Sequence, residues 1–123
     1  MLRRMQTDLG SVIYHDGVLA DMVGRATTEC YGVAGMASRS LQDDISAVLG
    51  QDSLARGVNV KAAPGDDSLI ITINIVVGYG VSIGEVARNI REKVNYIVAR
   101  NTGFAVSEVN VNVRGVKVTR MNE

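Results

Sequence analysis

The stretch SLIITINIVVGYGVSIGEV, Ser68 to Val86, decides the fold because its apolar period changes within it. From Leu69 to Val77 every second residue is Leu, Ile or Val, which predicts a strand with one buried face. Ser82 and Glu85 then form an S-x-x-E capping box, and apolar residues recur at helical spacing as far as Val98. The stretch therefore predicts a strand, a glycine turn and a helix in direct succession.

The C-terminal half of the chain predicts two more strands. Residues 58–63 alternate in polarity and precede the turn sequence APGDD, so they form an antiparallel hairpin with residues 69–77. Gly103 is placed to end the helix, and Val109, Val111 and Val113 alternate with asparagines in a last strand.

The N-terminal half predicts a strand and two helices. Residues 9–14 read as the strand, and Asp16 is a plausible N-cap for an amphipathic helix whose apolar stripe includes Cys30. The glycines of GVAG, Gly32 to Gly35, break this helix, and a short second helix is expected over residues 40–49.

The predicted order is β-α-α-β-β-α-β, in a single domain over residues 8–118. Residues 1–7 are expected to form a flexible N-terminus and residues 119–123 a C-terminal end. Strands with one apolar face and helices with one apolar stripe predict an α/β two-layer sandwich, a small mixed sheet with helices on one face.

The composition excludes several classes of function. Lys plus Arg is 13 and Asp plus Glu is 13, so the net charge is zero, which disfavours binding dominated by phosphate contacts. The single cysteine cannot form an intramolecular disulfide or a thiolate metal site. No apolar run approaches the roughly 20 residues of a membrane-spanning helix, and no secretory signal is visible, so we expect a cytoplasmic protein.

The three glycines of VVGYGVSIGEV resemble a phosphate-binding loop, but their spacing does not fit one. Gly78, Gly80 and Gly84 are not spaced as G-x-G-x-x-G, and no Gly-Lys-Ser/Thr follows. We interpret Gly78 and Gly80 as turn residues with positive φ, and Gly84 as a position of close packing on the sheet. No cofactor and no small-molecule substrate is predicted.

Residues suited to catalysis or metal binding are few. Cys30 and His15 could be imagined as a nucleophile and its base, but Cys30 falls on a core stripe and no third orienting group is evident. With one histidine in the chain, no metal site is predicted. We expect no catalytic residue and a protein that is not an enzyme.

The GVAG segment supports one alternative function. A KH domain clamps single-stranded nucleic acid with a GXXG loop between two helices, and Gly32, Val33, Ala34 and Gly35 match that spacing. The two middle residues are apolar, and the chain has one phenylalanine and no basic excess, so nucleic-acid binding is disfavoured. It is retained as the alternative.

The sheet face turned away from the helices is the leading candidate for an interaction site. It is expected to be polar yet mostly uncharged, so it can hydrogen-bond a partner without the desolvation cost of charges. Ile70 and Val76 would add apolar contact there, and residues 58–63 could offer an exposed edge. The predicted face comprises Asn59, Lys61, Thr72, Asn74, Asn110 and Asn112.

Three segments carry a resemblance to a known family: GSVIYHDGVLADMVGRATTECYGVAGM (10–36), SLIITINIVVGYGVSIGEVARNIREKV (68–94) and TGFAVSEVNVNVRGVKV (102–118). The most telling pieces are GVAG, YGVSI-x-EVA and VNV-x-V. In their order and spacing the chain resembles the alkaline shock protein, or envelope stress response, family of Gram-positive bacteria.

The resemblance implies a cytoplasmic protein that self-associates and acts in cell-envelope homeostasis. Some members of the family are held under the membrane by an integral membrane partner. Others are encoded near fatty-acid kinase components, which implies a link to lipid metabolism. The family has no established catalytic residues, so the resemblance assigns none. The expected partners are further copies of the chain and a membrane-anchored protein.

Overall fold

The strand predicted from residues 69–77 is the centre of the main sheet. A computed structural model of the chain describes residues 2–38, 49–65 and 67–118, and in it strand β5 spans Leu69–Gly78. Strand β4 (Val58–Ala62) pairs with β5 antiparallel and strand β6 (Val106–Lys117) pairs with it in parallel. The predicted hairpin and final strand are therefore confirmed.

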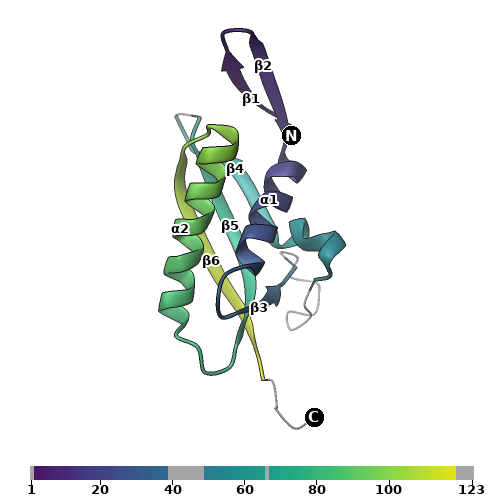
Figure 1. Cartoon of the computed structure of the whole chain (residues 1–123), viewed down its shortest axis with the longest axis vertical. Coiled ribbons are helices and arrows are strands. Elements are labelled where there is room, and N and C mark those ends of the chain that lie inside the picture. The colour runs from purple at the N-terminus through teal and green to yellow at the C-terminus, as the bar shows by residue number, and fades with distance from the viewer. Residues whose placement is uncertain (1, 39–48, 66, 119–123) are drawn as a thin grey trace.

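Strand β5 has different neighbours on its two edges. On one edge β4 covers Leu69–Ile73, and strand β3 (Val33–Met36) pairs antiparallel with Ile75–Val77. On the other edge β6 follows β5 along its whole length (Figure 1). The sheet is thus mixed, as predicted, and every other strand in it is bonded to β5.

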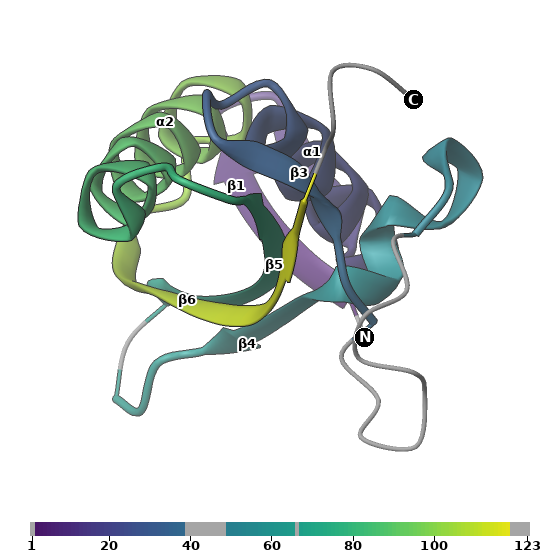
Figure 2. The ribbon, with the colours of Figure 1, turned by 90° about the horizontal axis from the view of Figure 1, so that it is seen from below.

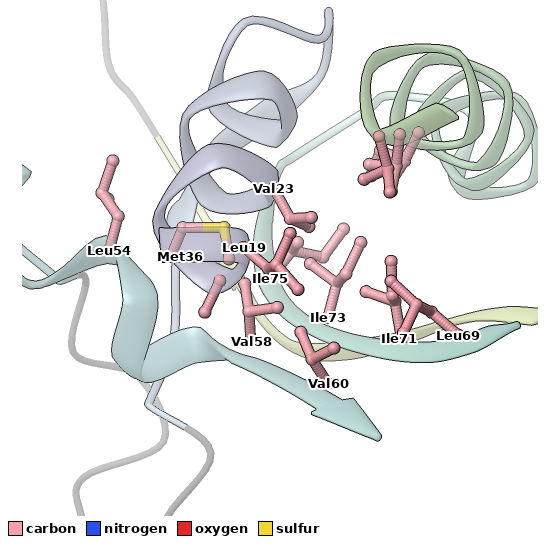
Figure 3. Packing of buried hydrophobic residues seen from close by; sticks show 14 of the residues in the cluster. Leu19, Val23, Met36, Leu54, Val58, Val60, Leu69, Ile71, Ile73 and Ile75 are labelled. Atoms are coloured by element: carbon pink, nitrogen blue, oxygen red, sulfur yellow. The ribbon is translucent and has the colours of Figure 1, made fainter. Parts of the chain in front are cut away.

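Both α-helices lie on one face of this sheet, as the predicted two-layer α/β fold requires (Figure 2). Helix α1 spans Asp16–Thr28 and helix α2 spans Ile83–Thr102. The core lies between the layers, where the inward residues of β5 meet Leu19 and Val23 of α1 (Figure 3). Five alternate residues of β5 are at most 1% exposed: Leu69, Ile71, Ile73, Ile75 and Val77.

Helix α2 begins and ends where its local chemistry indicates. The backbone N–H of Glu85 donates to the Ser82 hydroxyl at 3.4 Å, which satisfies one of the free donors of the first turn. Gly103 adopts a left-handed conformation at the C-cap, with φ of 83°. The buried stripe of the helix comprises Val86, Ile90, Val94, Val98 and Thr102.

The N-terminal segment differs from the expected flexible end. Strand β1 (Leu2–Thr7) pairs antiparallel with strand β2 (Gly10–His15), and Figure 1 shows this hairpin projecting beyond the sandwich. Arg3 anchors its base, because Nε lies 3.0 Å from Asp16 Oδ1 and a terminal nitrogen donates to the Val60 carbonyl at 3.3 Å. Asp16 therefore pairs with Arg3 instead of capping α1, which has no side-chain cap.

The segment between α1 and β4 also departs from the prediction. The GVAG sequence does not connect two helices, because Val33–Met36 form β3. Only Leu49 of the helix expected over residues 40–49 lies among the described residues, and it is not helical. A 3-10 helix, η1 (Gln51–Gly57), leads directly into β4.

Candidate interaction face

The sheet surface opposite the helices is the candidate interaction face, and the strand register builds it from three strands. Asn59 of β4, Thr72 of β5 and Asn110 of β6 lie side by side in one row. Asn74 and Asn112 form the next row. We call this surface the outer face; it comprises Asn59, Lys61, Ile70, Thr72, Asn74, Glu108, Asn110 and Asn112. The structure thus brings together all six residues predicted from the sequence.

Asn74 lies on the outer face but is not available to a partner. It is 3% exposed, and its Nδ2 donates to the carbonyl of Gly57 at 3.1 Å. Its Oδ1 accepts from Asn112 Nδ2 at 3.2 Å and lies 3.5 Å from a terminal nitrogen of Arg114. The Asn74 amide therefore joins three segments of the chain.

The apolar contribution expected on this face is also smaller than predicted. Val76 is 2% exposed, so it cannot contact a partner, whereas Ile70 is half-buried. Ile70 lies in a row between Lys61 and Glu108, which carry opposite charges. Four predicted residues are exposed, namely Asn59, Lys61, Asn110 and Asn112, and Thr72 is half-buried.

The GVAG segment lacks the geometry that a nucleic-acid clamp requires. Val33 pairs with Val77 and Gly35 with Val76, so the segment is bonded into the sheet. Gly32 has a φ of 91°, and a Cβ there would lie 2.5 Å from Cγ2 of Val86. The close approach of the backbone to α2 therefore accounts for the presence of glycine at position 32.

Two basic side chains of α2 that could attract a phosphate, Arg88 and Lys93, are paired within the chain. Arg88 forms ion pairs with Glu85 and Glu92. Lys93 Nζ lies 2.8 Å from a carboxylate oxygen of Glu29, and this hydrogen bond raises the pKa of Lys93. The pairing lowers the positive potential that helix α2 presents.

His15 and Cys30 do not form a catalytic pair. They flank the two ends of the 13-residue helix α1, whose rise of 1.5 Å per residue separates them by about 20 Å. Partial burial raises the pKa of the Cys30 thiol, so less of the nucleophilic thiolate forms at neutral pH.

The glycine turn between β5 and α2 is built differently from the prediction in two places. Gly80 has a positive φ of 90°, as expected, but Gly78 does not. Gly78 instead donates its N–H to the carbonyl of Gly32 at 2.9 Å. Nothing lies within 4 Å of a Cβ placed on Gly84, so this glycine is not required for packing.

A groove between α2 and β6 was not predicted from the sequence. Its walls include Tyr96, Ala99 and Arg100 of α2 and Val106 and Val109 of β6. The Arg100 guanidinium carbon lies 5.8 Å from the centroid of the Tyr96 ring. The spacing of Tyr96 and Arg100, four residues apart on the polar side of a helix, was the only sequence signal for this surface.

The fold and the outer face define a small α/β domain that presents a polar, mostly uncharged sheet surface. Among the described residues, no helix combines the length and apolar character needed to cross a bilayer. Residues 4–118 match the alkaline shock protein 23 family, described as having a cell envelope-related function. The chain therefore belongs to this family.

Curated relatives support the same assignment. The chain is 37% identical to the uncharacterised protein YloU of Bacillus subtilis over 116 residues, 94% of this chain and 95% of YloU. It is 36% identical over 123 residues to the uncharacterised protein Spy1614 of Streptococcus pyogenes, covering 99% and 100% of the two chains. The B. subtilis protein YqhY is 30% identical over 111 residues, 90% of this chain and 80% of YqhY. No solved structure matches the chain.

Proposed function

We propose that this protein is a non-enzymatic interaction module of the cell envelope, which associates with copies of itself and with a membrane-anchored protein partner. The outer face is the proposed surface for the membrane-anchored protein. The observation that carries this proposal is the aligned row of Asn59, Thr72 and Asn110 across three strands. Such a row offers amide and hydroxyl groups at fixed spacing on a rigid sheet.

The chemistry of the outer face favours a protein partner. Neutral amides and hydroxyls lose less hydration energy on burial than charged groups, so they suit the interior of an interface. The opposite charges of Lys61 and Glu108, on either side of Ile70, would set the orientation of the partner at the rim. The family description, cell envelope-related function, supports a partner at the membrane.

Affinity capture with matched variants tests the outer face. The tagged chain is incubated with a B. subtilis lysate in which membranes are retained, and captured proteins are quantified by mass spectrometry. The test variant carries Asn59→Lys and Asn110→Lys, both at exposed positions of the outer face. The control carries Asn89→Lys and Asn101→Lys, which make the same chemical change at exposed positions of α2.

We expect an integral membrane protein to be captured by the wild type and by the control but lost from the test variant. Circular dichroism must show that all three chains are folded. The proposal fails if the test variant captures the same proteins as the wild type, or if the wild type captures no membrane protein.

A further inference from the structure

Strand β6 is an edge strand whose central part has little protection against pairing. It is bonded to β5 on one side, and no strand in the described part of the chain pairs with its other side. A free edge presents a row of backbone N–H and C=O groups, which proteins commonly guard with charges, proline or bulges. The central residues of β6, Val109 to Val113, carry no charge and no proline and keep a regular register with β5. Register shifts flank this stretch at residues 106–108 and 113–115, and they turn Val106 and Val116 to the same face as Val109 and Val113.

The sequence of β6 is close to a chemical palindrome centred on Val111. Val109 and Val113 flank the centre with Asn110 and Asn112 between them. Glu108 and Arg114 lie three residues out on either side and carry opposite charges, and Val106 and Val116 lie five residues out. An antiparallel pair of two such strands with a twofold axis at Val111 therefore opposes Val109 to Val113, Asn110 to Asn112 and Glu108 to Arg114, and the register shifts at both ends of β6 keep Val106 and Val116 on the valine face.

This pairing would also cover exposed apolar surface. Directly opposed residues of an antiparallel pair point to the same face of a sheet. Val113 and Val116 of the second copy, which are 37% and 52% exposed in the single chain, would lie beside Val109 and Val106. Those two valines line the groove beneath α2, so the second copy would close its open side.

We propose that two copies of this chain pair through their β6 edges, antiparallel and centred on Val111, and so form one continuous sheet across a dimer. This inference specifies how the self-association proposed above takes place and rests on it. The occupant is a second copy because Glu108 of each chain meets Arg114 of the other, which gives two opposite-charge pairs per dimer. Both α2 helices would lie on the same side of the joined sheet.

Charge reversal tests the pairing without relying on loss of folding. Glu108→Arg leaves a chain with two positive charges at the paired positions, and Arg114→Glu leaves one with two negative charges. Each variant alone would place like charges opposite each other twice per dimer. A mixture of the two variants would restore both opposite-charge pairs in a heterodimer. The control is Asp67→Arg, an acid-to-base change at an exposed position of the turn between β4 and β5.

Sedimentation velocity over a dilution series measures the dimer dissociation constant. We expect the dimer dissociation constant of each single variant to be at least roughly tenfold higher than that of the wild type, because two favourable charge pairs become unfavourable. The equimolar mixture and the Glu108→Arg/Arg114→Glu double variant should return close to the wild-type value, and Asp67→Arg should not change it.

The possible failures are distinguishable. A wild-type chain that stays monomeric at high micromolar concentration would refute self-association and with it the β6 dimer. A wild-type dimer that both single variants leave unchanged would refute β6 pairing while self-association stands. Loss of dimer in both single variants without recovery in their mixture would also refute the pairing.

Discussion

Replacement of Asn74 by alanine should destabilise the fold, whereas the same change at Asn110 should not. Both asparagines lie on the outer face, but Asn74 is 3% exposed and Asn110 is exposed. Without the Asn74 amide, the carbonyl of Gly57 loses its 3.1 Å donor at a buried site. An unsatisfied buried acceptor costs about 1–3 kcal/mol, while Asn112 and Arg114 can turn to solvent with little loss.

A loss of about 2 kcal/mol in the free energy of unfolding, the middle of this range, corresponds to a measurable fall in Tm. An unfolding entropy of about 2.1 cal/mol/K for each of the 123 residues amounts to about 0.26 kcal/mol/K, so Tm should fall by about 8 °C. Asn110→Ala removes one hydrogen bond, to Glu108, at an exposed site and should shift Tm by less than about 2 °C.

Urea unfolding followed by circular dichroism, together with thermal melts, measures both variants against the wild type. Equal midpoints for Asn74→Ala and Asn110→Ala would refute the reasoning, because they would show that the Asn74 network adds nothing to the free energy of unfolding. All samples should have the same protein concentration, since association would raise the apparent Tm.

Three further predictions concern single residues. Gly57→Ala should destabilise the fold by more than about 2 kcal/mol, because a Cβ there would lie 2.6 Å from the Ala37 carbonyl oxygen. Gly84→Ala should instead stabilise α2 by about 0.4–1 kcal/mol, because nothing lies within 4 Å of a Cβ at that position. Urea titrations measure the free energy of unfolding of both variants. Ser82→Ala should cost about 1 kcal/mol through loss of the α2 cap, and Ser82→Asp should recover most of it in the same assay. Because burial raises the pKa of the Cys30 thiol, the midpoint of its alkylation by iodoacetamide should lie at higher pH in the folded chain than in urea; identical pH profiles would contradict this.

The half of the fold that follows from local chemistry could be predicted from the sequence. The alternation of Leu69 to Val77, the APGDD turn and the capping box at Ser82 each act over a few residues, so the structure repeats what these segments indicate. The period of two also placed Asn74 on the outer face. Its burial depends on the Gly57 carbonyl, which comes from another segment, and no local pattern reports that contact.

The parts that differed are held by pairing with another segment, which the pattern within each segment does not report. Strand β1 has the sequence LRRMQT, which lacks a clear alternation, and it is fixed by pairing with β2 and by the ion pair between Arg3 and Asp16. Strand β3 contains the glycines of GVAG, which locally favour a turn, but hydrogen bonds to β5 keep it extended. The groove between α2 and β6 was missed because its two walls come from separate elements.

The parallel pairing of β5 with β6 has a consequence for the nascent chain. The second edge of β5 stays open until β6 has been synthesised, and 39 residues separate Gly78 from Lys117. At about 5–20 residues per second the ribosome needs roughly 2–8 s to supply them. During that interval the most apolar strand of the protein is available to strands of neighbouring polypeptides on the same messenger. Translation speed therefore sets how long this chain is exposed to aggregation.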